Sequence, residues 1–255
     1  MKNIFVISKY TFIEVYRSKV MLGILFLSVA MIFMTFIASA FAYGAPEKIA
    51  LDFSIGIMSV TNLLMSIFLG VTLVSKEIES RTLYMIISRP ISRFSYLLGK
   101  IIGLSSVLII NTIFLTLVGM ISYRYLGGVG DELIYWVSFF NLLEAIIILL
   151  FGVLFSLISN PSLAAVFTML VLISGHAITS TISNFFAKTS TTVMMTLKYS
   201  LFFIPDLDRL NLKDFLIYKQ SLPTSFLLSN FLYASLYIGA ILIALSLIFD
   251  KKNLD

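Results

Sequence analysis

The 255-residue chain is 59% hydrophobic and only 12% charged, with a formal net charge of +5, one histidine and no cysteine. Because a soluble domain carries about 25% charged residues, this composition excludes a globule in water and indicates that the bilayer is the solvent for most of the protein. The missing cysteine excludes disulfides and zinc–thiolate sites, and the basic charge is typical of loops beside anionic lipid rather than of nucleic-acid binding.

Six apolar segments are long enough to cross a bilayer, which requires about 20 mostly apolar residues. We expect an all-α, six-span membrane domain over residues 20–255, with spans at 20–41, 53–74, 97–123, 133–158, 162–186 and 225–249. Ala38-Ser39-Ala40 resembles a signal-peptidase site, but the first apolar run exceeds the roughly 7–15 residues of a signal peptide. Residues 1–19 are therefore expected to form a cytoplasmic amphipathic helix before an uncleaved anchor.

Lysine and arginine gather before the first span, between the second and third spans, and after the last span. The positive-inside rule then places both termini and the connection at 76–93 in the cytoplasm. The long segment at 187–224 is expected to be external.

The connection between the second and third spans interrupts two long uncharged runs. Glu77 and Arg81 stand four residues apart with the acid first, which favours a helical pair. Pro90 prevents the helix from continuing, and Ser92 is a typical N-cap for the next helix. The pattern predicts a short amphipathic helix, an elbow and re-entry into the membrane. It fits a solvated connector, or a knob that docks into a soluble partner.

The same stretch resembles the intracellular signature of ABC-2-type permeases, the membrane subunits of ATP-binding cassette exporters: E-x-E-x-[GR]-T-[LI]-x-x-[IL]-[LI]-[ST]-x-P-[IV]-[ST]-R, then Y-x-x-[GS]-K. The matching residues are Glu77, Glu79, Arg81, Thr82, Leu83, Ile86, Ile87, Ser88, Pro90, Ile91, Ser92, Arg93, Tyr96, Gly99 and Lys100. Arg81 departs from the commoner glycine.

Three shorter elements extend the resemblance along the chain. The E-x-x-R-S element at 14–18 fits the family's amphipathic N-terminal helix. Gly175-His176 and the run I-P-D-L-D-R-L-N-L-K-D-F at 204–215 are similar to the branch that contains the nitrous-oxide-reductase copper-maturation permease.

The resemblance implies a permease in the cytoplasmic (inner) membrane of a prokaryote. It would pair with a second permease protomer, identical or related, and with two copies of a separate ABC ATPase. The ATPase-coupling residues implied are Glu77, Glu79, Arg81, Thr82, Pro90 and Arg93. The chain has no G-x-x-x-x-G-K-[ST] loop, so we expect no enzymatic activity and no cofactor of its own, with ATP and Mg bound by the partner ATPase. The alternative is a non-transporting scaffold that drives an external partner protein.

Small residues recur at the start of the third span, at Ser95, Gly99 and Gly103. Such steps allow close helix contact, either with a partner protomer or, as we favour, with a helix of the same chain.

The external segment at 187–224 has aromatic residues followed by a charged run. We weigh an amphipathic helix on the outer leaflet against a gate over the exit or a docking surface for an external partner. The residues of that gate or partner surface are Pro205, Asp206, Asp208 and Arg209.

Polar residues recur at one depth of the predicted bundle. Glu144 and His176 each lie sixteen residues from Asn160, which at 1.5 Å per residue places both about 24 Å from the turn at Asn160-Pro161. We expect an intramembrane polar layer of Asn62, Asn111, Glu144 and His176 that faces protein or the translocation path. Glu144 and His176 either pair directly or bond separately to backbone or water. A lone histidine without H-E-x-x-H disfavours a metal site and histidine-based catalysis.

Overall fold

The computed structural model describes residues 2–18, 20–41, 44–79, 92–130, 132–185, 204–218 and 222–251. All secondary structure in these ranges is helical. The elements are α1 (Lys2–Arg17), α2 (Val20–Ala40), α3 (Pro46–Glu79), α5 (Arg93–Tyr125), α6 (Leu133–Ile158), α7 (Pro161–Phe185), the 3₁₀ helix η1 (Asp208–Leu210), α9 (Lys213–Ile217) and α10 (Thr224–Lys251).

Each of the six predicted spans falls on one long helix, and α6 has the predicted bounds. The helix of the second predicted span, α3, begins well before the expected residue 53. Pro46 occupies its first position and Glu47 its first turn, and both residues favour a helix start there. At its other end α3 continues to Glu79. The helix expected in the coupling segment is therefore continuous with the second span up to that residue.

Four helices are long and apolar enough to cross a membrane, judged by length and composition. They are Pro46–Thr72 of α3, Arg93–Tyr125, Leu133–Ile158 and Thr224–Lys251. Within the described residues, the apolar helical parts of α2 and α7 are shorter, at Phe26–Ala40 and Pro161–Ala177. The chain is therefore a multi-pass helical membrane protein, while the full set of six spans stays a prediction.

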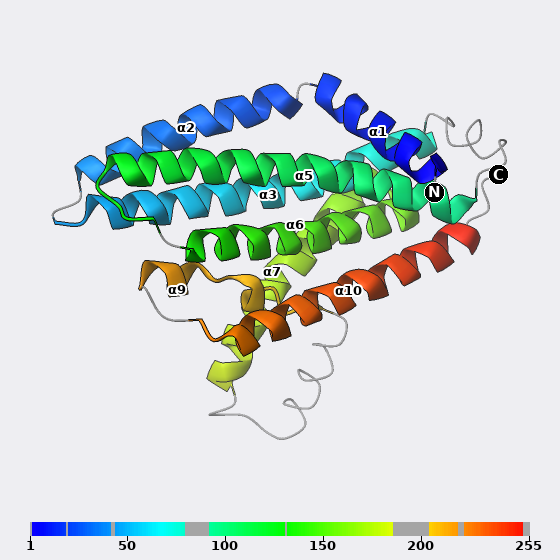
Figure 1. Ribbon diagram of the computed structural model, residues 1–255. Coiled ribbons are helices and arrows are strands. Elements are labelled where there is room, and N and C mark those ends of the chain that lie inside the picture. Colours follow the sequence, from blue (N-terminus) through cyan, green and yellow to red (C-terminus); the bar gives the residue numbers. More distant parts are fainter. Residues whose placement is uncertain are drawn as a thin grey trace.

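The helices form an elongated bundle whose two ends differ. The start of α1, the end of α3, the start of α5 and the end of α10 lie together at one end of the bundle (Figure 1). The α5–α6 connection and α9 lie towards the opposite end (Figure 1). We call the first the coupling end and the second the cap end. The predicted coupling segment connects helices at the coupling end, where both ends of the described chain also lie.

The centre of the bundle is the crossing of α3 with α6. A Cβ on Gly70 would lie 2.6 Å from the carbonyl oxygen of Leu149 and 3.2 Å from Cα of Gly152. Only glycine allows two backbones to approach this closely. Most of α6 is buried around this crossing, so its apolar side chains face protein rather than lipid.

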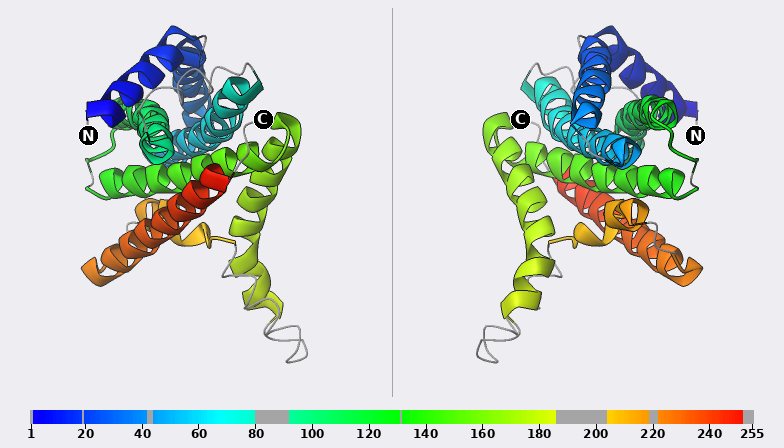
Figure 2. Two further views of the ribbon diagram at one scale, coloured as in Figure 1. Left: turned by 90° about the vertical axis from the view of Figure 1, so that its right-hand side faces the viewer. Right: turned by 90° about the vertical axis from the view of Figure 1, so that its left-hand side faces the viewer.

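The turn between α6 and α7 is as tight as Asn160-Pro161 predicts. Ser159 N–H donates to the Phe155 carbonyl at 2.9 Å, and Ala164 N–H donates to the Asn160 carbonyl at 2.9 Å. Beyond this turn α7 projects from the bundle, as both views of Figure 2 show.

Candidate functional site

The predicted ATPase-coupling residues are only partly within the described chain. Arg81, Thr82 and Pro90 lie outside the described residues. The backbone of Glu77 and Glu79 belongs to the last turns of α3, and nothing is described of their side chains. Arg93 is the first residue of α5. The coupling motif is thus framed by two helix ends at the coupling end of the bundle.

The predicted N-cap at Ser92 is confirmed. Its side chain accepts a hydrogen bond from Ser95 N–H at 3.2 Å, which satisfies one of the free donors of the first turn of α5. The helix that follows the motif therefore begins at a defined residue.

Arg93 joins the motif to the last helix. Its guanidinium donates to the carbonyl oxygens of Phe249 and Asp250, each at 3.1 Å. These carbonyls belong to the last turn of α10, where helices carry unpaired acceptors and partial negative charge. The Tyr96 and Phe249 rings stack beside this contact, with centroids 6.1 Å apart. A displacement of the start of α5 would therefore be transmitted to α10.

A second contact joins the motif to α1. Lys100 Nζ lies 3.2 Å from Glu14 Oε2, with the lysine side chain 3% exposed and the glutamate side chain 46% exposed. This ion pair brings the E-x-x-R-S element and the Y-x-x-[GS]-K element together, although they are far apart in sequence.

The small residues at the start of α5 face α1, so the internal contact is confirmed. A Cβ on Gly99 would lie 2.8 Å from Cβ of Ile7, and one on Gly103 would lie 2.8 Å from the carbonyl oxygen of Ser8. These glycines let α1 lie against α5.

The amide part of the polar layer is a buried hydrogen-bond network. Asn111 Nδ2 donates to Asn62 Oδ1 at 2.7 Å, and Asn62 Nδ2 donates to Asn141 Oδ1 at 2.6 Å and to Thr112 Oγ1 at 2.9 Å. Asn62 and Asn111 are both fully buried. Sequence reasoning missed Asn141, although it lies one helical turn before Glu144 on α6, and it missed Thr112 beside Asn111.

The ionisable part of the layer is the contact between α6 and α7. Glu144 Oε1 lies 3.3 Å from His176 Nε2, with the glutamate side chain 2% exposed. The two groups are within ion-pair distance, but Oε1 accepts no hydrogen bond from any residue that the structure describes. This contact agrees with the prediction that Glu144 and His176 lie at the same depth because each is sixteen residues from Asn160. Glu144 also lines a cavity. The direct contact with His176 corresponds to the first of the two alternatives, and no hydrogen bond of Glu144 Oε1 to backbone is described.

The described part of the external segment packs into the bundle and does not form a long helix. The buried leucines of this part are Leu207, Leu210, Leu212 and Leu216. Leu207 N–H donates to the Gly175 carbonyl at 3.2 Å, and a Cβ on Gly175 would lie 2.8 Å from Cδ1 of Leu207. Gly175-His176 and the 204–215 run are therefore in contact. We call residues 204–217 the cap. The helix on the outer leaflet stays a prediction, because the aromatic residues at 199–203 that would face the membrane lie outside the described residues.

Polar contacts fasten the cap to α10. The Asp206 N–H donates to the Tyr233 hydroxyl at 2.7 Å, and Asn230 Nδ2 donates to the Arg209 carbonyl at 2.9 Å. The Arg209 guanidinium donates to Asp206 at 2.8 Å and lies over the Tyr233 ring, 5.3 Å from its centroid. Of the residues predicted for this surface, Pro205 and Asp206 are buried, whereas Asp208 and Arg209 are exposed.

An ion pair fastens the cap to α3. Lys213 Nζ lies 2.7 Å from Asp52 Oδ1. No sequence signal joins these two residues, since they are distant in the chain and belong to no common motif.

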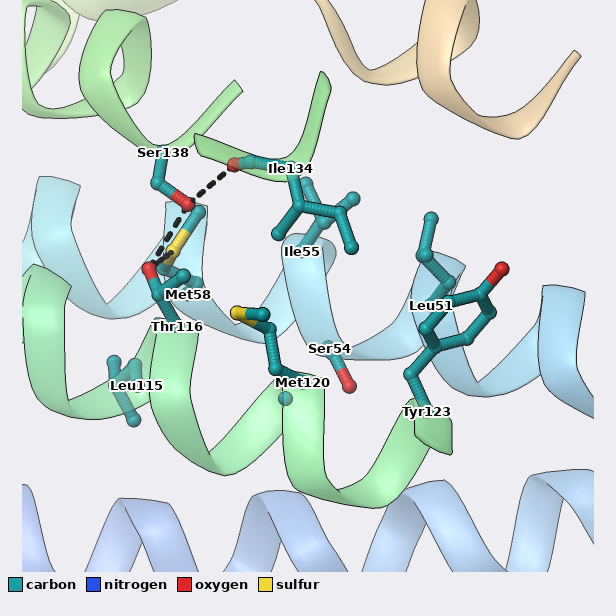
Figure 3. A pocket seen from close by; sticks show the side chains of 11 residues that line it. Leu51, Ser54, Ile55, Met58, Leu115, Thr116, Met120, Tyr123, Ile134 and Ser138 are labelled. Carbon is teal, nitrogen blue, oxygen red and sulfur yellow. Dashed lines mark hydrogen bonds between the residues drawn. The ribbon is translucent and has the colours of Figure 1, made fainter. Parts of the chain in front are cut away.

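A second cavity lies between α3, α5 and α6, nearer the cap end (Figure 3). Its volume is about 20 Å³, which is enough for one water molecule. At one side Thr116 Oγ1 donates to Ser138 Oγ at 2.9 Å and also contacts Met58 Sδ at 3.4 Å (Figure 3). The Ser54 hydroxyl, which also lines it, has no hydrogen-bond partner in the described chain, so a single water fits this site.

The described residues contain no group of three or more His, Cys, Asp or Glu side chains that could hold a metal ion. A scan of protein-family models gives no match for this chain, and a search of curated proteins gives none either.

Proposed function

We propose that this chain is the permease subunit of an ABC-2-type exporter, in which a separate ATPase drives substrate export across the cytoplasmic membrane of a prokaryote. The assembly would contain two permease protomers, identical or related, and two ATPase subunits. The six spans would have both termini in the cytoplasm.

The observation that carries this proposal is how the end of the coupling motif is fastened. Arg93 binds the last turn of α10 and Lys100 binds Glu14 of α1. Three helices are therefore linked within two turns of the motif. An ATPase that pushes on the segment between α3 and α5 would move α1, α5 and α10 together, as coupling requires.

The proposal is tested by charge reversal in the motif. The proposed partner ATPase is co-expressed with a tag and purified together with the permease. Glu77→Lys with Arg81→Glu should reduce the permease recovered at least fivefold, because a docking surface depends on complementary charge. The matched control is Glu132→Lys with Arg124→Glu, which reverses two exposed charges at the opposite end of the bundle. Equal recovery of both double variants would contradict the proposal.

A second candidate function is transmission of ATPase motion to an external partner without transport. It is favoured by the exposed Asp208 and Arg209 on a cap that is fastened to α10. Vesicles that contain the purified complex distinguish the two functions, since only an exporter moves a solute when ATP is hydrolysed without an external partner.

A further inference from the structure

A groove between α5 and α6 has no part in the proposed coupling function. Its volume is about 320 Å³. The apolar side chains of its wall include Ile109, Ile113 and Leu117 of α5 and Phe139 and Leu142 of α6. Those of α5 are exposed, and both helices are long and apolar enough to cross a membrane. The groove therefore opens towards the hydrocarbon of the bilayer.

The wall of the groove contains three hydroxyl groups, and each already donates a hydrogen bond within the protein. Thr112 donates to the Leu108 carbonyl at 2.8 Å, and Ser138 donates to the Ile134 carbonyl at 2.9 Å. Thr116 Oγ1 donates to Ser138 Oγ at 2.9 Å. A polar occupant would lose its hydrogen bonds to water and gain no donor from these groups, which is costly. The wall therefore favours a hydrocarbon.

The groove runs along α5 for the depth of one leaflet. Ile109, Ile113 and Leu117 stand at intervals of four residues, so they form one stripe along the helix. Met120, which also lines the groove, follows Ile109 by eleven residues, a distance of about 16 Å along a helix. Half of the hydrocarbon core of a bilayer is about 15 Å thick. Tyr135, near the start of α6, lines the groove as well, so the groove leads to the cap end.

A cation follows the groove at the cap end. Thr116, Met120 and Arg124 stand four residues apart, and the first two line the groove. Helical side chains lean towards the N-terminus of their helix, so the Arg124 side chain leans from the last turn of α5 back towards Met120. Arg124 is exposed and forms no ion pair with a described carboxylate. A guanidinium at this level can bind a phosphate through two parallel hydrogen bonds.

The aromatic residues at the same end of α6 agree with a position at the headgroups. Tyr135 and Trp136 are exposed in the first turn of α6. Tyrosine and tryptophan are enriched where a bilayer meets water, because their rings are apolar and their N–H or O–H groups are polar. Arg124 and these rings are therefore expected at the level of lipid phosphates, with the groove below them in the acyl region.

The dimensions of the groove favour an acyl chain over a helix of a second protein. A helix about 10 Å in diameter occupies about 1,200 Å³ over a length of 16 Å, several times the volume of the groove. An apolar helix would also leave Arg124 without an anion. A phospholipid supplies both a narrow apolar chain and a phosphate.

We propose that this groove binds one phospholipid of the leaflet at the cap end, with an acyl chain between α5 and α6 and the phosphate at Arg124. The groove leads to the cap end, whereas the coupling motif lies at the coupling end of the bundle. The lipid site does not depend on an ATPase, so the two proposals succeed or fail separately.

The acyl part of the proposal is tested by photo-labelling of the full chain in nanodiscs. The probe is a phosphatidylglycerol that carries a diazirine in the middle of one acyl chain, and peptide mass spectrometry locates the adducts. Labelling within 109–142 should exceed labelling of the exposed face of α10 at least fivefold. Ile113→Trp, which fills the groove from an exposed position, should remove this excess. Ile243→Trp, at an exposed position of α10, is the matched control and should leave it unchanged.

The phosphate part is tested with a diacylglycerol that carries the same photoreactive chain but no phosphate. It should label the groove at least fivefold less than the phospholipid does. Arg124→Gln should reduce phospholipid labelling to the diacylglycerol level, whereas Lys48→Gln, which removes an exposed cation from the first turn of α3, should not. Equal effects of these two variants would overturn the proposal.

Two further outcomes would also overturn it. Equal labelling of the groove and of α10 would show that only bulk lipid covers the groove. The last outcome concerns a second copy of the chain. Ile113→Cys introduces the only cysteine, so a disulfide-linked dimer of this variant, together with an unlabelled groove in the wild type, would assign the groove to a protein interface.

Discussion

Glu14 and Lys100 form an ion pair, 3.2 Å between Oε2 and Nζ, that joins the N-terminal helix to the helix that follows the coupling motif. The lysine is almost completely buried while the glutamate is half-exposed. A buried charge depends on its partner more than a surface charge does, so the pair is asymmetric: losing Glu14 leaves a buried ammonium with one counterion fewer.

We therefore expect Glu14→Gln to lower the free energy of unfolding by about 1–2 kcal/mol, a value reduced from that of a fully buried pair because Glu14 is exposed to solvent. Glu14→Gln combined with Lys100→Met should recover much of the loss. Thermal melting in detergent measures both, with Glu132→Gln as the exposed control. A double variant as unstable as the single one would show that the charge of Lys100 has another role.

At the crossing of α3 and α6, the position of Gly70 should tolerate no side chain. Gly70→Ala places a Cβ about 2.6 Å from a backbone oxygen of α6, and overpacking of this kind costs typically 1–3 kcal/mol or more when backbone must move. The yield of folded protein and the melting temperature should both fall. Gly239→Ala is the matched control, since a Cβ there meets nothing within 4 Å. If the two variants have the same melting temperature, the two helices are less closely packed at Gly70 than described.

Asn62 should be the most sensitive member of the amide network, because it contacts Asn111, Asn141 and Thr112 at once. Asn62→Leu leaves the Asn111 donor and the acceptor oxygens of Asn141 and Thr112 without their partner, at a cost of about 1–3 kcal/mol. Asn3→Leu, at an exposed position of α1, controls for the change in polarity. Chemical unfolding in mixed micelles measures the difference in stability. Equal stability of the two variants would show that the amide network does not stabilise the fold.

The cap should loosen when its anchor on α10 is removed. Tyr233→Phe deletes the hydroxyl that accepts the Asp206 N–H at 2.7 Å. Since the chain has no cysteine, Leu207→Cys provides a unique probe at a fully buried cap position. Maleimide should label this cysteine several-fold faster in the Tyr233→Phe background. Tyr135→Phe, an exposed tyrosine on α6, should leave the rate unchanged; identical rates in both backgrounds would show that Tyr233 does not hold the cap.

The sequence predicts the long helices well because each is an apolar run with a local start or stop signal. Ser92 at the start of α5 and Asn160-Pro161 between α6 and α7 define their boundaries through local hydrogen bonds. The contact between Glu144 and His176 follows from the same local geometry, since a tight turn places residues equidistant from it at one depth.

The contacts that sequence reasoning missed depend on how distant helices are placed. Nothing in the sequence relates Asp52 to Lys213. The buried leucines of the cap show no helical periodicity, because its helical elements, Asp208–Leu210 and Lys213–Ile217, are too short to repeat it. Asn141 was accessible in principle, since it shares a helical face with Glu144.

Coupling to an ATPase is tested most directly by a cross-link from the motif. Thr82→Cys, which introduces the only cysteine of the chain, is labelled with a benzophenone maleimide and irradiated in the complex with the proposed partner ATPase. Val129→Cys, at an exposed position in the connection between α5 and α6 at the cap end, serves as the control. We predict an adduct of permease and ATPase from position 82 and none from position 129. No adduct from position 82, or equal adducts from both positions, would contradict the account.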